Sequence, residues 1–443
     1  MLGAPVFRTA LFGPWSGNAL WTAARAVPSL DLCFADKKDL ICASSGRQLV
    51  TFARASSGTF VDSAGVLQTA ATDVPRFDHN PLTGESLGLL VEEQRTNLLL
   101  RSEEFDNASW TKTQINAFGS GSVVDAIAAP NGSITADLIT ENTATAGHRV
   151  SQDTVSGTVA LGTYTTSVYF KSKERTRCYL NYTDNATGEV TATFNLSNQS
   201  SSITAGGSWT GSLASIQAVG NNWYRCSLTA TKGNSSFALN LRVGIADNSS
   251  NISYTGDGTS GIYIWGAQLE AGAFASSYIP TTTAAATRNA DVAQITGTNF
   301  SSWYRQDEGT LYAETRGVLG SSIIFSVDDG TTSNRIIAGY NAATSIQWRV
   351  VAGGVEQLNV NPGGIPATAG DLLRYAHAYR ANNFGGAANG ASTMAVSSGS
   401  VPSVNRINIG SNVNSVGQPN GHIRRFVYWP QALPGQLQAI TQP

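Results

Sequence analysis

Apolar and polar residues alternate with a period of two in short runs through most of this chain. Between residues 103 and 285 these runs have the length of β-strands, and Asn-, Gly- and Ser-rich segments separate them. The clearest runs are TYTTSVYFKS (163–172), RCYLNYT (177–183), VTATFNLS (190–197), WYRCSLTAT (223–231), FALNLRVGI (237–245) and GIYIWGAQLE (261–270). Because successive side chains of a strand point to opposite faces, the pattern predicts stacked sheets of a sandwich or jelly roll.

From about residue 300 a second series of strand-length runs follows, with Asp-Gly, Gly-Gly and Asn-Gly turns between them. These runs are GTLYAETRG, SSIIFSVDDG, NRIIAGY, SIQWRVVAGG, LRYAHAYRANN, RINIGS and GHIRRFVYWP. The Thr- and Ala-rich stretch after Pro280 has no core periodicity, so we expect a linker at 286–299. The sequence therefore predicts an all-β, multidomain protein with β-sandwich domains at 103–285 and 300–443.

The first hundred residues divide into two stretches. Residues 1–50 carry aromatic side chains among Gly and Pro without a sustained period, which predicts an N-terminal attachment arm. The alternative is that this segment packs on its own domain. The candidates for contact with a partner are Phe7, Phe12, Trp15 and Trp21. Residues 51–102 alternate short apolar runs with turn residues and predict a β-hairpin connector region.

The junction between residues 77 and 110 holds several charged residues. Its acids do not have a partner arrangement for catalysis, and two arginines are available to pair with them. The acids are Glu92, Glu93, Glu103 and Glu104, and the arginines are Arg95 and Arg101. We interpret the junction as a structural clasp.

Charge and composition narrow the classes of partner. Charged residues make up 13% of the chain, about half of the usual ~25%, and 28 basic residues balance 30 acidic ones for a formal net charge of -2. No basic excess exists to neutralise phosphates, so nucleic acid is not an expected partner. No apolar run approaches about 18 residues, so no membrane insertion is expected either. We expect no cofactor.

The cysteines and one aspartate are considered as candidates for a zinc site, a disulfide and a calcium site. Cys33, Cys42, Cys178 and Cys226 do not have zinc-site spacing. Cys178 and Cys226 lie in similar strand contexts and could face each other, either as a disulfide or as buried free thiols. Asp257 in the loop TGDGTSG is a candidate calcium ligand, with a plain Gly-rich turn as the alternative.

The acidic residues of the last 140 residues do not predict glycoside hydrolysis. That reaction needs two carboxylates on either side of the scissile bond. Asp307-Glu308, Glu314, Asp328-Asp329 and Glu356 are isolated or belong to expected turns. We therefore expect a protein that is not an enzyme.

Sugar binding is a sharper hypothesis for one strand. In RYAHAYRANN, Tyr375, His377 and Tyr379 project from one face, and the alanines between them project from the other. Rings and planar polar groups together suit a sugar, so the predicted glycan-binding residues are Tyr375, His377, Tyr379, Arg380, Asn382 and Asn383. The alternative is that the aromatic residues form ordinary core.

Three stretches carry a resemblance to known proteins. Residues 51–110 resemble a block found in tail-associated and appendage proteins of tailed bacteriophages. GAQLEAGAFASSYIPTTTAAATRNADV (266–292) resembles the end of a carbohydrate-binding-module-like jelly roll. The closing GHIRRFVYWPQALPGQLQAI is similar to the usual ending of concanavalin A-like lectin and laminin-G-like domains.

This resemblance implies a virion structural protein, most simply a tail fibre or related appendage. It would attach to other virion proteins through its N-terminal segment, self-associate as a homotrimer and recognise host-surface polysaccharide through its β-sandwich domains. One alternative is a capsid decoration or cement protein, or a tail-joining protein, without a ligand. A further alternative is a polysaccharide-degrading enzyme.

Overall fold

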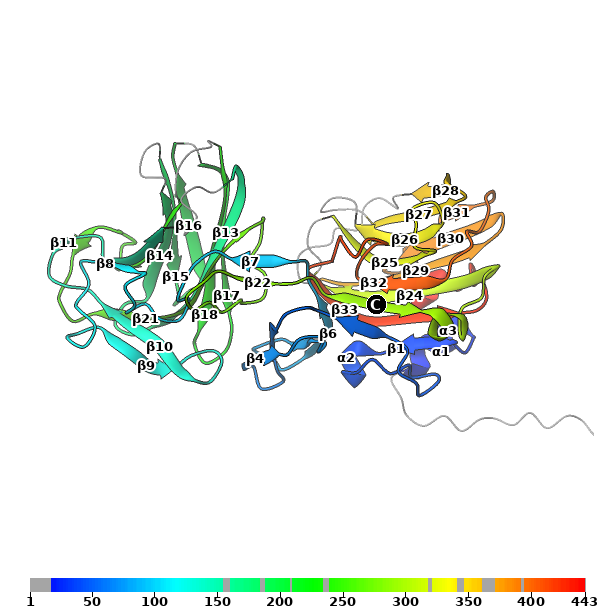
Figure 1. Ribbon diagram of the computed structural model, residues 1–443, viewed down its shortest axis with the longest axis horizontal. Coiled ribbons are helices and arrows are strands. Elements are labelled where there is room, and N and C mark those ends of the chain that lie inside the picture. The colour runs from blue at the N-terminus through cyan, green and yellow to red at the C-terminus, as the bar shows by residue number, and fades with distance from the viewer. Residues whose placement is uncertain are drawn as a thin grey trace, which may run out of the picture. The chain divides into compact units, whose positions relative to one another are not determined.

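The computed structural model confirms the all-β class, with antiparallel sheets in two compact units (Figure 1). The central unit is Phe52–Asp291, and the terminal unit combines Met1–Thr51 with Val292–Pro443. The structure describes residues 17–153, 160–183, 188–207, 209–233, 239–317, 321–340, 346–360, 371–391 and 394–442. Within these residues no helix is long and apolar enough to cross a membrane.

The central unit is built on two antiparallel sheets. One has the order β17 (Trp209–Ala218), β18 (Tyr224–Lys232), β13 (Gly162–Ser172), β21 (Gly261–Ala271), β10 (Ile134–Thr140), β9 (Val123–Ala128). The other has the order β16 (Ser200–Ala205), β15 (Glu189–Asn195), β14 (Arg177–Thr183), β19 (Asn240–Ala246), β12 (Arg149–Asp153), β8 (Thr111–Thr113). Their inward residues form one apolar core, to which Val168, Phe170, Leu180 and Leu228 contribute.

A second, smaller core lies in the central unit. It contains Tyr169, Trp223, Trp265 and Tyr278, with ring centroids of Tyr169 and Trp265 5.3 Å apart. Both tryptophans are buried. Shorter ladders complete the unit: β3 (Gly58–Val61) with β4 (Leu67–Ala70), β5 (Phe77–His79) with β6 (Ser86–Val91), β7 (Arg95–Asn97) with β22 (Ala286–Arg288), and β11 (Thr145–Ala146) with β20 (Tyr254–Thr255).

The terminal unit also packs one sheet on another. One sheet contains β31 (Met394–Val396), β30 (Asn383–Ala388), β29 (Leu372–Arg380), β24 (Glu308–Arg316), β33 (Gly421–Trp429) and β1 (Leu30–Leu32). The other contains β23 (Val292–Thr296), β32 (Arg406–Ile409), β25 (Ser322–Asp328), β26 (Arg335–Tyr340), β27 (Ile346–Ala352) and β28 (Val355–Val360). Phe325 meets Phe426 between the sheets, with centroids 5.4 Å apart. The short strand β2 (Thr51–Ala53) spans the boundary between the units.

The described residues of the terminal unit form four short helices: α1 (Gly17–Ala24), α2 (Phe34–Lys37), α3 (Gly297–Ser301) and α4 (Leu437–Ile440). Leu20 and Ala24 of α1 pack with Leu437 and Ile440 of α4 in one cluster. Residues 17–51 are therefore part of the unit that holds the C-terminal sandwich. The stretch 286–299, where we expected a linker, contains β22, β23 and the start of α3.

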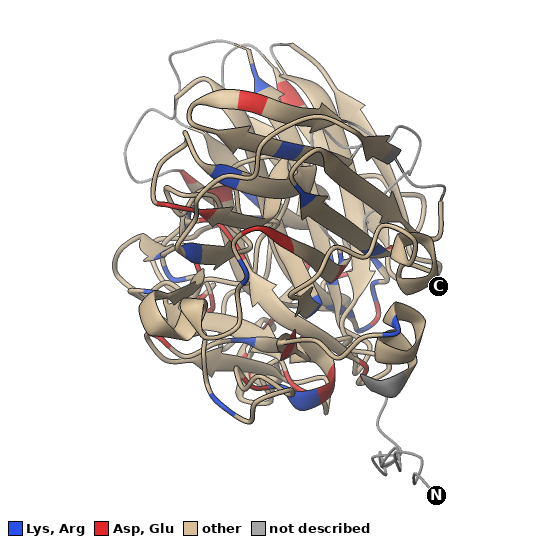
Figure 2. Ribbon diagram, turned by 90° about the vertical axis from the view of Figure 1, so that its right-hand side faces the viewer, with Lys and Arg blue, Asp and Glu red and all other residues tan. Residues whose placement is uncertain are grey.

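Charge is sparse and mixed in sign. Lys and Arg residues are interspersed with Asp and Glu along the ribbon (Figure 2). This agrees with the small net charge of the sequence.

Candidate functional site

The predicted glycan-binding strand is β29, and the structure places its aromatic residues in the interior. Tyr375, His377 and Tyr379 have no exposed surface. Tyr375 faces Phe325 of the other sheet, and the opposite face of β29, with Ala376 and Ala378, belongs to the cluster with α1 and α4. Because both faces of the strand are covered, the hypothesis that these three residues contact a sugar is corrected: they form core.

His377 shows the consequence of this burial. Its ring stacks on Trp348 with centroids 5.6 Å apart and an interplanar angle of 16°. Neither ring nitrogen has a hydrogen-bond partner in the described part of the chain. Burial disfavours the charged imidazolium and lowers the pKa of His377 to about 4. The residue is therefore a neutral core side chain at neutral pH.

The other three predicted residues lie at the turn that joins β29 to β30, and they reach solvent. Arg380 is 57% exposed, with its Nη1 4.0 Å from Glu308 Oε2. Asn382 has a φ of 57°, a left-handed conformation that Asn tolerates better than most residues. Its Oδ1 accepts from Gly399 N at 3.1 Å, and its N–H donates to Gly399 O at 2.9 Å. Asn382 thus fixes the segment that follows β31 beside the turn.

This turn borders a shallow depression of about 360 Å³ in the terminal unit. Its lining residues are Gln306, Asp307, Ala381, Ser400, Val401, Pro402 and Ser403. The lining combines a carboxylate, an amide and two hydroxyl groups with the apolar surface of Val401 and Pro402. Sequence reasoning named Arg380, Asn382 and Asn383 as candidates but missed the lining, because residues 306–307 and 400–403 meet this turn only in the folded sheet.

Asp307 is the charged group of the depression, and it is 67% exposed. Arg305 donates two hydrogen bonds to this carboxylate from one edge of its guanidinium, with Nε 2.6 Å from Oδ1 and Nη2 2.7 Å from Oδ2. These hydrogen bonds hold the pKa of Asp307 below its usual value. Asp307 is therefore an ionised hydrogen-bond acceptor at neutral pH. The Nε2 of Gln306 donates to Val404 O at 3.1 Å and orients that amide.

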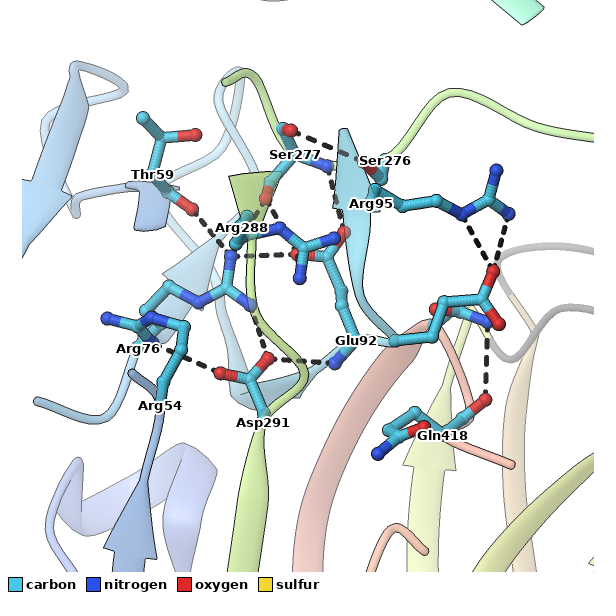
Figure 3. Close-up of polar contacts among 12 residues, drawn as sticks. Arg54, Thr59, Arg76, Glu92, Arg95, Ser276, Ser277, Arg288, Asp291 and Gln418 are labelled. Atoms are coloured by element: carbon cyan, nitrogen blue, oxygen red, sulfur yellow. Dashed lines mark hydrogen bonds and ion pairs between the residues drawn. The ribbon is translucent and has the colours of Figure 1, made fainter. Parts of the chain in front are cut away.

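A buried charged cluster joins distant segments of the central unit (Figure 3). Asp291 accepts from Arg54 Nη1 at 3.1 Å and from Arg76, and Arg76 Nη1 lies 2.7 Å from Glu92 Oε2. Arg288 Nη1 lies 3.4 Å from the same Glu92 oxygen. All five side chains are almost fully buried. The cluster fastens residues near the start of the unit to residues at its end.

Glu92 is ionised inside this cluster. Burial opposes its charge, but Arg288, Arg76 and hydrogen bonds from Ser277 outweigh burial and hold the pKa of Glu92 well below its usual range. The expected pairing of arginines with acids inside the junction is confirmed: Arg95 Nη2 lies 2.5 Å from Glu93, and Arg101 Nη1 lies 2.9 Å from Glu104.

The candidate calcium loop uses its carboxylate to shape its own turn. Asp257 Oδ1 accepts from the N–H groups of Thr259 and Ser260 at 2.8 and 2.7 Å, and Oδ2 accepts from Ser260 Oγ at 2.6 Å. These contacts fit the plain-turn alternative. Across the described ranges, no group of three or more His, Cys, Asp or Glu residues is placed to hold a metal ion.

The four cysteines are buried free thiols. Cys178 of β14 and Cys226 of β18 both belong to the main core of the central unit. The buried-thiol alternative therefore describes this pair. Burial raises the pKa of Cys178 well above its usual value, which makes it a poor nucleophile.

Of the predicted attachment residues, only Trp21 lies within the described residues; Phe7, Phe12 and Trp15 lie outside them. Trp21 is half-buried in α1, and its Nε1 donates to Asp31 Oδ2 at 2.9 Å. Asp31 is also bound by Arg425, with Nη2 2.6 Å from Oδ2. Trp21 thus contacts its own unit.

Comparisons with known proteins give weak likenesses of fold. No protein-family model matches this sequence, and no curated protein matches it. One similar solved structure is the Ruminococcus gnavus IT-sialidase CBM40 bound to alpha2,3 sialyllactose, with 16% identity, a TM-score of 0.26, and 31% of this chain and 84% of that chain covered. Domains LG4-5 of the mouse laminin alpha1 chain give 9% identity, a TM-score of 0.23, and coverage of 65% and 85%.

A third similar structure is the Trypanosoma rangeli sialidase in complex with the inhibitor DANA, with 9% identity and a TM-score of 0.24. It covers 69% of this chain and 60% of that chain. TM-scores of this size assign neither a function nor a ligand to this chain.

Proposed function

We propose that this chain is a non-enzymatic virion protein of a tailed bacteriophage, a tail fibre or related appendage, that recognises host-surface glycan. The observation that carries the recognition part is the depression beside the β29–β30 turn. It is open, it holds an ionised carboxylate, and the turns around it are fixed by hydrogen bonds.

The chemistry of the depression suits a neutral polyol. A sugar offers hydroxyl donors to Asp307, and it offers both donors and acceptors to Ser400 and Ser403. Its C–H face needs an apolar surface, which Val401 and Pro402 supply. The Arg305 fork fixes the Asp307 carboxylate, so less side-chain entropy is lost when a ligand binds.

The same geometry supports binding rather than hydrolysis. A glycosidase needs one carboxylic acid that keeps its proton until it donates it to the leaving group. Asp307 has a lowered pKa, and its neighbour Glu308 lies 2.8 Å from Arg305 Nη1. The pairing with Arg305 favours the ionised form of Asp307.

The remaining parts of the proposal rest on the resemblance of residues 51–110 and 266–292 to appendage proteins. They are attachment to other virion proteins through the N-terminal segment, assembly as a homotrimer and a location in the virion. Imaging of labelled protein on intact particles tests them, and a position on the capsid lattice would favour the decoration or cement alternative.

A binding screen tests the recognition part. Full-length protein is applied to an array of bacterial envelope polysaccharides, together with Asp307→Ala and the control Glu356→Ala. Glu356 is also an exposed acid of the terminal unit, and it pairs with Arg349 at 2.7 Å. We expect the wild type to bind at least one polysaccharide. Asp307→Ala should lose about tenfold or more in affinity, because a hydrogen bond to a charged group contributes about 1.5–3 kcal/mol. Glu356→Ala should bind as the wild type does. Absence of binding across the array, or equal binding by Asp307→Ala, would contradict the proposal.

A further inference from the structure

The central unit carries a second concavity, a cleft of about 400 Å³. This volume lies within the range of about 300–1,000 Å³ that small-molecule sites occupy. Val66, Ala129 and Pro130 give the cleft an apolar wall, and Lys171, Asn221 and Asn222 give it a polar one. We call it the Lys171 cleft.

A tight turn presents the two asparagines. Asn221 and Asn222 have φ values of 50° and 60°, which Asn adopts more readily than most residues, and both are exposed. Trp223 N donates to Gly220 O at 2.8 Å and closes the turn. The indole of Trp223 is buried, and its Nε1 donates to Ala128 O at 3.1 Å. The turn is thereby anchored to the opposite side of the cleft.

The apolar wall is held with similar rigidity. Ala129 N donates to Ser133 O at 2.8 Å, and Gly132 N donates to Ala129 O at 2.9 Å. Pro130 O accepts from Leu67 N at 3.0 Å, which ties this turn to the β3–β4 hairpin that carries Val66. A site whose walls are fixed before binding pays less ordering entropy when a ligand enters.

Lys171 is the cationic group of the cleft. It lies near the end of β13 and is half-buried, and within the described residues its ammonium has no hydrogen bond or ion pair. Lys173, two residues further on, differs: its Nζ lies 2.9 Å from Glu174. The side-chain amides of Asn221 and Asn222 also have no partner in the described part of the chain. The cleft therefore presents one positive charge and two free amides.

We propose that the Lys171 cleft binds a carboxylated sugar unit of an acidic polysaccharide. Lys171 would pair with the carboxylate, and each amide, with one acceptor and two donor hydrogens, would bind ring hydroxyls. The C–H face of the sugar would lie on Val66 and Pro130. A single ammonium matches one negative charge, whereas a phosphate of about -2 charge is usually held by several cationic or backbone N–H donors. This inference concerns other residues, in another unit, than the depression at Asp307.

The test uses the full-length protein and a panel of uronic-acid oligosaccharides, with the methyl esters of the same oligosaccharides as neutral probes. Binding is measured by calorimetry. We expect at least one uronate to bind, its methyl ester to bind about tenfold or more weakly, and Lys171→Gln to cause a loss of similar size. Asn221→Gly with Asn222→Gly, which keeps the left-handed backbone accessible, is expected to weaken binding of acid and ester alike.

Two matched controls separate this site from others. Lys173→Gln removes a neighbouring lysine that already has a partner. Asp307→Ala removes the carboxylate of the other proposed site. We expect both variants to bind the uronate with the affinity of the wild type. Lack of binding by every uronate, equal affinity for acid and ester, or wild-type affinity of Lys171→Gln would each overturn the proposal. Competition by inorganic phosphate at the same concentration as the uronate would overturn its ligand class.

Discussion

At the scale of single residues, the alternation along β29 predicted correctly which side chains share a face. It could not predict that both faces are covered. Tyr375 and His377 lie under the second sheet, and Ala376 and Ala378 lie in the cluster with α1 and α4. The covering residues of α1 precede β29 by more than three hundred positions, so no local pattern announces them. The exposed turn at Asn382 and Asn383 carried a readable signal, because Asn is favoured in tight turns.

His377 leads to a prediction about stability. Within the described residues, both ring nitrogens of His377 are buried without hydrogen-bond partners, which costs free energy that Phe at this position would not incur. We expect His377→Phe to raise the free energy of unfolding of the terminal unit by about 1 kcal/mol at neutral pH. His148→Phe is the contrasting variant, because His148 Nδ1 lies 2.5 Å from Gln114 O and can donate to it, and we expect its loss to destabilise the central unit. Urea unfolding at pH 7.5 measures both.

The lowered pKa of His377 in the wild type predicts how the stability difference between wild type and His377→Phe changes with pH. The folded protein binds the His377 proton only near pH 4, whereas the unfolded chain binds it near 6.5. The stability associated with neutral His377 is therefore fully present above about pH 6.5 and is lost as pH falls toward 4. We expect the advantage of His377→Phe to grow between pH 7.5 and 4.5. An advantage that stays constant or shrinks would contradict the buried neutral state.

The stability that Asp137 contributes changes with pH in the opposite direction to that of His377. Burial raises the pKa of Asp137 to about 7, although the N–H groups of Phe105 and Asp125 donate to its two oxygens at 2.9 and 3.0 Å. Between about pH 4 and 7 the folded state keeps a proton that the unfolded chain releases, so this contribution to stability is lost as pH rises. We expect Asp137→Asn to be less stable than the wild type at pH 5, because one N–H loses its acceptor, and the difference to shrink at pH 8. Urea unfolding at both pH values measures this, and an equal difference would contradict it.

At the scale of elements, strands were the most predictable feature, because their period of two depends only on neighbouring residues. The sequence did not predict which strands pair with each other. The stretch 286–299 has few apolar residues, yet Ala293 and Ile295 are buried in β23, and Arg288 of β22 enters the charged cluster. The partners of that cluster are Arg54, Arg76 and Glu92, which precede it by about two hundred positions. Single charges in turn-rich sequence do not reveal such a cluster.

The charged cluster gives an element-scale prediction. Removal of one acid leaves buried arginines without a counter-charge, which typically costs about 3–5 kcal/mol. We therefore expect Asp291→Ala to destabilise the central unit by about that amount. Glu174→Gln, which removes the partner of Lys173 at the surface, should change stability by less than about 1 kcal/mol. Thermal unfolding of the two variants measures this difference. An Asp291→Ala variant as stable as Glu174→Gln would show that the charged cluster does not stabilise the central unit.

At the scale of the whole molecule, the chain interrupts one β-sandwich unit to form another. Residues up to Thr51 and from Val292 onward make the terminal unit, and the indole of Trp429 donates to Ala26 O at 3.0 Å within it. Composition predicted the low and nearly balanced charge of the chain, and the alternation of apolar and polar residues predicted the all-β class. Neither could place the two concavities, because the depression at Asp307 and the Lys171 cleft are each assembled from turns far apart in the sequence.

We propose that the terminal unit holds a glycan in the depression beside the β29–β30 turn. The most direct measurement is the structure of the full-length protein in complex with the polysaccharide fragment selected on the array. We predict a sugar ring with hydroxyl groups on the Asp307 carboxylate and its C–H face on Val401 and Pro402. A glycan that contacts none of the residues 306–307, 381 and 400–403 would contradict the account.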